Sequence, residues 1–299
     1  KSGAFNLQAQ SGVLNTQLMV GGRDFKSDLL NRLVQAPLKL TAPVTLSQQA
    51  VQATYQLEGA SLGGKGDVAY DLASGTTETN LQIFAAPSAL PEALTAKLTK
   101  TAGLAGNVRI VNGAVEAKNV VLTSELVEAR GSASLRSGAI DAAFNGTLPD
   151  LARLSAGAQG SGSFSLAASG TLEAPSAKIS LAVPKAVLSG KQLDGFSADV
   201  TAALSQGAIG GDIKAKGSIA GQAIDVDAVM KQDKGRTAIP DLQVKIGPNV
   251  ISGALTLDAA FLPDGKLTFD LPGLSLIGAM AAQPLNGALK GNLALSAPQ

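Results

Sequence analysis

Residues 246–295 read IGPNVISGALTLDAAFLPDGKLTFDLPGLSLIGAMAAQPLNGALKGNLAL, and this stretch indicates the kind of fold most directly. Within it, Leu267 and Phe269 alternate with polar neighbours, and residues 250–257 and 289–295 alternate in the same way. A period of two is typical of a β-strand with one face turned away from water. The stretch therefore predicts a strand, a turn, a strand, a short non-strand segment and a further strand.

The same order of elements recurs at three places in the chain. Each unit begins with a strand that carries a glycine, at Gly66, Gly131 or Gly253, and a second strand follows. A break that contains Leu and Pro comes next, and a strand led by Gly closes the unit. The wider second interval between the three glycines leaves room for additional strands, so we expect imperfect repeats. The predicted segments are a loosely patterned β segment at 1–60, two β-repeat units at 61–174, an intervening strand set at 175–235 and a third unit at 236–299.

The alternation predicts an all-β chain, with one continuous sheet in preference to separate domains. Counting alternating runs gives roughly 22–26 strands, with a few very short helices expected at 28–36, 87–100 and 149–155. An open sheet with so many strands must curl, twist or split. The predicted fold class is therefore a long, curled, repetitive antiparallel-type sheet, shaped as an open trough.

Composition excludes most kinds of chemistry. The chain of 299 residues contains no Cys and no His, which removes Cys nucleophiles, Cys or His metal sites and Ser-His-Asp triads. Aromatic residues are 3% of the chain and the net charge is +1, so neither stacking rings nor a basic bias points to nucleic acid. We find no credible catalytic constellation and expect no enzyme activity, no metal and no cofactor.

The ends of the chain suggest a segment of something longer. The sequence begins with Lys1, and no apolar run approaches the ~20 residues that a membrane helix needs. The absence of Cys fits an oxidising compartment. We therefore expect that any targeting signal or membrane anchor lies outside this segment.

Every predicted strand has one apolar face, and the sequence offers no set of amphipathic helices to cover it. The sheet must then fold into sandwiches, close into a barrel or curl into a trough with an apolar inner wall. An outer-membrane barrel needs aromatic girdles, which eight Phe, two Tyr and no Trp scarcely provide. A β-solenoid adhesin and a plain sandwich spacer stay open as alternatives, although solenoids usually have short, regular rungs.

The stretch GALTLDAAFLPDGKLTFDLPGLSLI at 253–277 resembles the TamB family of the AsmA-like superfamily. The segments AASGTLEAP at 167–175 and VLSGKQLDGFSADVTAAL at 187–204 carry the same resemblance, which covers most of residues 60–299. It implies a long curled sheet, called a β-taco, with a hydrophobic groove along its length. It also implies a periplasm-spanning protein, anchored in the inner membrane of Gram-negative bacteria. Such proteins move phospholipid toward the outer membrane and, with the barrel protein TamA, support the assembly of outer-membrane proteins.

The chain departs from a complete family member in two ways. It has no amino-terminal membrane helix, and no recognisable version of the carboxy-terminal end that contacts TamA. The resemblance is therefore to an interior, periplasmic segment. The inner-membrane anchor and any contact with a TamA-like barrel partner are expected in parts outside this chain.

From the alternation we nominate apolar residues that would line the lipid groove against phospholipid acyl chains. They are Val127, Ala129, Ala133, Leu135, Phe164, Leu166, Ile179, Leu181, Val200, Ile224, Val226, Val244, Ile246, Ile251, Leu255, Leu257, Leu267, Phe269, Leu293 and Leu295. The same residues would equally fill the core of a closed sandwich, and alternation alone does not separate the two. A register error of one residue would move a whole strand's set to the other face.

Other features are better explained structurally. Asp225 and Asp227 lie two residues apart on one strand face, and Lys214 and Lys216 do the same, so we interpret all four as solvated outer-face charges. The glycines at 63–66 and 210–211 lack the strand–loop–helix context of a phosphate loop. They are interpreted as bends or bulges that let the sheet curl. Two functional alternatives to a lipid groove remain: a chaperone-like surface for unfolded outer-membrane strands, which would use the sheet edges, and a structural or adhesin-like β-repeat.

Overall fold

A computed structural model describes residues 2–6, 11–20, 38–205, 207–233, 235–258, 262–280, 283 and 285–296. The helix expected at 28–36 lies outside these residues. The chain divides into two units, Lys1–Gly146 and Thr147–Gln299, and each is described by itself. Both are built from antiparallel strands, as the alternation predicted.

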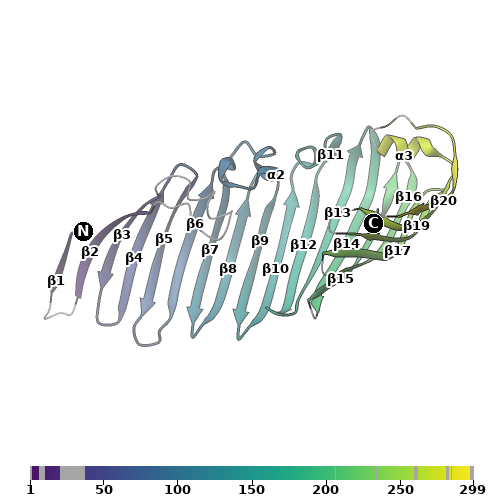
Figure 1. The fold of residues 1–299 in the computed structure, drawn as a ribbon. Coiled ribbons are helices and arrows are strands. Elements are labelled where there is room, and N and C mark those ends of the chain that lie inside the picture. Colours follow the sequence, from purple (N-terminus) through teal and green to yellow (C-terminus); the bar gives the residue numbers. More distant parts are fainter. Residues whose placement is uncertain are drawn as a thin grey trace. The chain divides into compact units, whose positions relative to one another are not determined.

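Unit 1 is a ladder of strands in chain order (Figure 1). From β1 to β9 each strand pairs antiparallel with the next, and β10 lies beside β9. The strands are β1 (Ser2–Asn6), β2 (Ser11–Val20), β3 (Leu38–Leu46), β4 (Ala50–Glu58), β5 (Leu62–Asp71), β6 (Thr77–Ala85), β7 (Ala102–Val111), β8 (Ala114–Thr123), β9 (Glu128–Arg136) and β10 (Ala139–Leu148).

Unit 2 is a second ladder with longer strands. From β12 to β20 each strand pairs antiparallel with the next, and the short β11 pairs with an end of β13. The strands are β11 (Ala158–Gly160), β12 (Gly162–Thr171), β13 (Pro175–Leu188), β14 (Lys191–Ser205), β15 (Ala208–Ile219), β16 (Gln222–Asp233), β17 (Arg236–Ile246), β18 (Asn249–Leu257), β19 (Pro263–Leu271) and β20 (Leu289–Leu295).

Short helices interrupt the ladders where the Leu/Pro breaks predicted a change. The 3-10 turn η1 (Pro87–Ala89) and α2 (Glu92–Thr95) follow β6, η2 (Leu151–Arg153) follows β10, and α3 (Leu274–Met280) follows β19. The helix expected at 87–100 is therefore confined to two short pieces. A hairpin, a helical connection and a further strand thus occur at all three predicted repeats.

The predicted curl into an open trough is not found, because neither ladder is closed or strongly curled. Among the described residues, β1 pairs only with β2 and β20 only with β19, so each ladder keeps a free edge. The coarser prediction, an all-β antiparallel sheet with a few short helices, is confirmed. The apolar face is accordingly the side of an open sheet and not the wall of a deep trough.

Against the roughly 22–26 strands expected for the whole chain, the described residues form 20. The alternating run at 187–193 is not a strand of its own. It contains the turn between β13 and β14, where Ser189 and Gly190 adopt φ values of 48° and 77°. Positive φ at two successive residues is the geometry of a tight hairpin turn. Alternation continues through such a turn and hides it in the sequence.

The glycines at 63–66 and 210–211 do not form bulges. β5 pairs with β4 and β6 without a register shift, and β15 runs through Gly210 and Gly211 in regular register. Gly66 instead makes room for a ring, since a Cβ there would lie 2.5 Å from Oη of Tyr55 on the adjacent strand. Gly64 and Gly211 likewise have cross-strand backbone atoms where a Cβ would lie, whereas a Cβ at Gly210 would meet nothing within 4 Å.

Two of the prolines within strands, Pro43 and Pro240, behave differently. Pro43 lies in β3, which pairs on both sides without a register shift, so this proline occupies neither an edge strand nor a bulge. The ladder is merely interrupted, because the register between β3 and β4 has no pair at Pro43. A bulge does occur in β17 between Ile239 and Leu242, which places Pro240 where a missing N–H costs no ladder bond.

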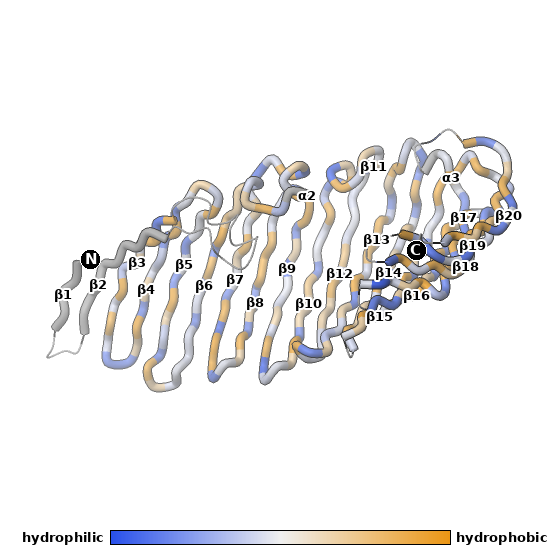
Figure 2. Tube along the Cα trace, viewed as in Figure 1, coloured by the Kyte–Doolittle hydropathy of each residue, from blue (hydrophilic) through white to orange (hydrophobic). Residues whose placement is uncertain are grey.

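Each ladder has an apolar and a polar face, and Figure 2 shows polar and apolar residues interspersed along the strands. On β4, Val51, Ala53 and Leu57 are half-buried, whereas the intervening polar residues are exposed. The most deeply buried cluster is small and lies in unit 2, where Ile219, Ile224 and Ile246 pack together with Leu276 of α3. Burial is therefore concentrated beneath the helical connection, at one end of the strands.

Candidate functional site

The apolar face of unit 2 is continuous across β12–β20. Two neighbouring rows of side chains cross these strands, and in each row every residue is the Cα partner of the next. The first row is Leu166, Ile179, Val200, Ile213, Ala228, Leu242, Gly253, Leu267 and Leu293. The second row is Phe164, Leu181, Ala198, Ala215, Val226, Val244, Ile251, Phe269 and Gly291. Direct partners in an antiparallel pair project from the same side of the sheet, so these rows form one surface.

The structure brings all nominated residues of unit 2 onto this surface. Ile224 and Ile246 are partners of each other on β16 and β17, and Leu255, Leu257 and Leu295 lie along the same face of β18 and β20. The remaining nominated residues of unit 2 belong to the two rows. No strand of unit 2 has its nominated set turned to the polar face, so the register error that alternation leaves open does not occur.

The nominated residues of unit 1 lie around β9. Ala129, Ala133 and Leu135 share one face and are partners of Leu122, Ala117 and Val115 on β8. Val127 is different, because it precedes the first residue of β9 and its carbonyl accepts a hydrogen bond from the backbone N–H of Ser124. Val127 is therefore part of a turn.

Most of the unit 2 surface is half-exposed. Ile179 and Leu293 keep 40% and 44% of their area open to solvent. Leu276 of α3 packs over one end of the face, against the cluster of Ile219, Ile224 and Ile246. Ile246 beneath α3 is only 8% exposed, and Ile224 is similarly buried. Ala215 and Ala228 in the two rows are also buried, at 8% and 7%, whereas the larger apolar side chains of the rows keep part of their area open to a ligand.

Sequence reasoning missed several members of this surface. Ile213 and Leu242 were not nominated, although the structure places them in the middle of the first row. The alternation of β15 contained the signal for Ile213. Leu242 was harder to assign, because the bulge in β17 shifts its register relative to Ile239.

The opposite face of unit 2 carries charges, as predicted for Asp225 and Asp227. Asp227 is the partner of Lys214, with 3.8 Å between the carboxylate and the ammonium, and Asp225 is the partner of Lys216. Both aspartates are exposed. Paired, exposed charges of this kind keep one side of the sheet in water and contribute little stability.

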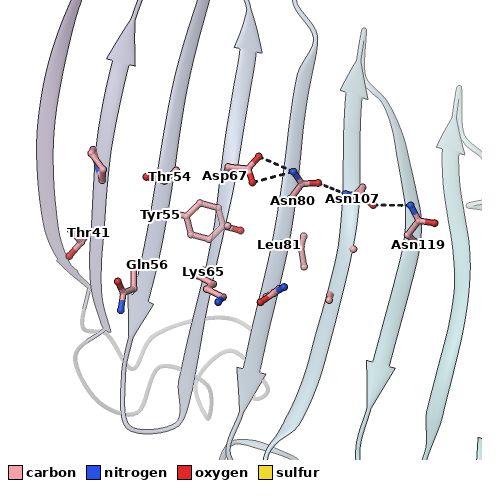
Figure 3. Close-up of a pocket in the computed structure, with 15 residues that line it drawn as sticks. Thr41, Thr54, Tyr55, Gln56, Lys65, Asp67, Asn80, Leu81, Asn107 and Asn119 are labelled. Atoms are coloured by element: carbon pink, nitrogen blue, oxygen red, sulfur yellow. Dashed lines mark hydrogen bonds between the residues drawn. The ribbon is translucent and has the colours of Figure 1, made fainter.

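Unit 1 has a second feature that the sequence did not predict, a polar hollow on the exposed side of β3–β8 (Figure 3). Its volume is about 800 Å³, within the range of small-molecule sites. Polar side chains from six successive strands line it, and they are Thr41, Thr54, Gln56, Lys65, Asp67, Asn80, Gln82, Asn107 and Asn119.

A chain of hydrogen bonds crosses the polar hollow. Asn80 donates to both carboxylate oxygens of Asp67, at 3.1 and 2.9 Å, Asn107 donates to Asn80, and Asn119 donates to Asn107 at 3.0 Å. Figure 3 shows these four side chains on four neighbouring strands. Asn119 reaches the row because β8 has a bulge there and Asn119 adopts a φ of 52°, a conformation that Asn tolerates better than most residues.

The next polar row consists of ion pairs. Arg109 lies 3.2 Å from Glu78, and Glu116 lies 3.1 Å from Lys118 and 3.2 Å from Arg136. The hydrogen bond from Lys118, with its charge and that of Arg136, lowers the pKa of Glu116 below its usual value. The charged side chains of this row are paired with one another, so none of them is left unpaired for a ligand.

Among the described residues, no group of three or more acidic side chains gathers closely enough to hold a metal ion. Within the same part of the chain, no helix has the length and apolarity to cross a membrane. Comparisons with protein-family models, with curated proteins and with solved structures give no significant match for this chain. The function must therefore be argued from the two faces of the sheet.

Proposed function

We propose that this chain is a periplasmic, TamB-like module that binds phospholipid acyl chains on its apolar face and conducts them between the inner and outer membranes. The observation that carries the proposal is the unbroken apolar register across β12–β20, on a side of unit 2 that stays half-exposed. Large exposed apolar surfaces are unusual on soluble proteins unless they meet an apolar partner. The resemblance to the TamB family supports acyl chains as that partner and an inner-membrane anchor outside this segment.

The open geometry predicts a weak hold on each lipid. An acyl chain on this face is contacted from one side, so each methylene contributes about 0.4 kcal/mol, half of the value for full burial. Ten methylenes then contribute about 4 kcal/mol, which corresponds to roughly millimolar affinity. Weak, repeated contacts along a row favour sliding from strand to strand over tight storage.

The experiment that tests the proposal uses adjacent residues on opposite faces of β19. A photo-crosslinking amino acid is placed at Phe269 on the apolar face, and separately at Thr268, whose hydroxyl donates to Asn292 on the polar face. With vesicles of phosphatidylethanolamine and phosphatidylglycerol, position 269 should capture phospholipid and position 268 should not. Equal capture at both positions, or none at 269, would contradict the proposal. Position 255 on β18 provides a second apolar-face site for the same measurement.

A chaperone-like function is the second candidate, and the free edge of β20 favours it. In the part of the chain that the structure describes, β20 pairs with β19 alone, and nearly all of its side chains are exposed. A free edge can pair with an extended strand of an unfolded outer-membrane protein. A crosslinker at Ala294 should then capture such a strand, whereas lipid capture at position 269 should fail. A structural or adhesin-like spacer predicts neither product.

A further inference from the structure

The polar hollow of unit 1 contains a row of side chains that the fold does not use. Thr41, Lys65 and Gln82 lie in one row across β3–β6, since Thr41 and Lys65 are partners of Gln56 and Gln82 is the partner of Lys65. Within the described part of the chain, the side chains of Thr41, Lys65 and Gln82 form no hydrogen bond or ion pair. They point donors and acceptors into the hollow without a protein partner.

The neighbouring row holds this unused row in place. Asp67, Asn80, Asn107 and Asn119 are linked into one chain of hydrogen bonds, so their amide planes are fixed. An amide nitrogen has two hydrogens and an amide oxygen has two lone pairs. The hydrogen bonds of this row use only part of these donors and acceptors. The hollow therefore combines a rigid amide row with a free polar row, as preorganised binding requires.

The charges of the polar hollow select against most classes of ligand. Lys65 and Asp67 are the only charged residues among its described lining, and they balance. A nucleic acid or a phosphate-rich ligand requires an excess of cations. Lipid tails require an apolar lining, which on this protein lies on the other face.

An extended peptide also fits poorly. Peptides bind sheets mainly by adding a strand at an edge or by filling apolar side-chain pockets. The polar hollow lies on interior strands, whose backbone groups already pair with neighbours on both sides. The lining combines hydroxyl, amide, ammonium and carboxylate groups with Pro43, Tyr55, Leu81 and Ala105. A complementary ligand carries many hydroxyls, some apolar C–H surface and little charge.

We propose that the polar hollow of unit 1 binds an oligosaccharide chain that lies across the strands, along the row of Thr41, Lys65 and Gln82. The hollow as a whole spans six strands, on the order of 24 Å at ~4.8 Å spacing, and the row itself spans four of them, about 14 Å, which suits a chain of a few sugar units. Sugar hydroxyls both donate and accept, so they match a mixed row of amide, hydroxyl and ammonium groups. This proposal is independent of lipid binding, because it concerns the polar face of unit 1.

The test is calorimetric titration of the full chain with two uncharged probes, a hexasaccharide of N-acetylglucosamine and a hexasaccharide of glucose. Thr41→Val keeps the shape and removes one hydroxyl, and Thr45→Val makes the same change on the same face of β3 outside the hollow. Gln82→Ala and Gln52→Ala form a second matched pair. Loss of one hydrogen bond should raise the dissociation constant about threefold to tenfold for Thr41→Val and Gln82→Ala. The two controls should stay within about twofold of the unaltered chain.

Three results would overturn the proposal. The first is that neither hexasaccharide binds at concentrations up to about 1 mM. The second is that the Thr45→Val control loses as much affinity as Thr41→Val. The third is that an extended Gly-Ser peptide displaces the bound sugar. Asn107→Leu adds a test of the rigid row and should weaken binding further than either single loss. Far-ultraviolet circular dichroism identifies unfolding in that variant, and the threonine pair keeps the test decisive if it occurs.

Discussion

The contrast between Ile179 and Ile246 provides the most direct check that the apolar face is uncovered. Both are isoleucines on the same face of unit 2, but Ile179 is 40% exposed and Ile246 is 8% exposed beneath α3. The perturbation is the same at both positions, Ile→Asp. Any intrinsic cost of Asp in a strand, at most about 1 kcal/mol, is shared by the two variants.

The expected costs follow from burial. Complete burial of an isoleucine contributes about 1.5–3 kcal/mol, so Ile179→Asp should lose about 1–2 kcal/mol of unfolding free energy and its carboxylate stays in water. At Ile246 the whole transfer energy is lost, and an unpaired carboxylate enters a packed cluster at a cost of several kcal/mol. Ile246→Asp should therefore cost about 5 kcal/mol or more.

Urea unfolding followed by circular dichroism measures both values, and co-sedimentation with phospholipid vesicles measures lipid binding of the folded variants. Ile179→Asp should stay folded and bind vesicles more weakly than the unaltered chain. Equal destabilisation by the two substitutions would refute the reasoning, because Ile179 would then be as deeply covered as Ile246. Unchanged vesicle binding by a folded Ile179→Asp would refute the lipid surface itself.

Two further predictions concern polar groups. Asn249 is buried, donates to the carbonyl of Ile246 and accepts from the backbone N–H of Gly273, so Asn249→Ala should cost about 1–3 kcal/mol in urea unfolding; a cost near zero would show that this link between β18 and the start of α3 is not needed. The pKa of Glu116 is lowered chiefly by its hydrogen bond with Lys118, so Lys118→Gln should raise it toward the usual value in a carboxylate NMR titration. A carboxyl whose pKa is lowered in the folded state contributes stability above its unfolded-state pKa, and this stability is lost as pH falls through the folded-state pKa. The Lys118→Gln variant should therefore lose less stability on acidification than the unaltered chain. An unchanged Glu116 pKa in the variant would contradict the assignment of the shift to Lys118.

Alternation in the sequence was enough to find the strands and to sort their residues by face. Leu267 and Phe269, nominated from period two alone, lie on one surface with Ile251, Val244 and Val226, which were nominated from other strands. This works because successive side chains of a strand point to opposite sides whatever the strand's neighbours are. The Leu/Pro breaks likewise indicated the helical connections, where Pro87, Pro91 and Pro272 lie outside the strands.

The polar hollow could not be found in this way. Asn80, Asn107 and Asn119 occupy exposed strand positions like many others in the sequence, and the donor and acceptor of each bond lie 12 to 27 residues apart. The helical connection between β6 and β7, the hairpin between β7 and β8 and the bulge in β8 bring them into one row. Register between strands depends on turn geometry and bulges, which polar residues in a strand do not encode.

The curvature of the sheet and the covering of its apolar face could not be predicted from the sequence either. Ile246 and Ile251 look alike as alternating apolar residues, yet α3 covers only the first. Which residues share a face is a local property of each strand, whereas the bend of the sheet sums small twists over many strand pairs. Whether an apolar side chain is a core residue or a surface open to a ligand depends on what the chain places above it, and that contact is made only in three dimensions.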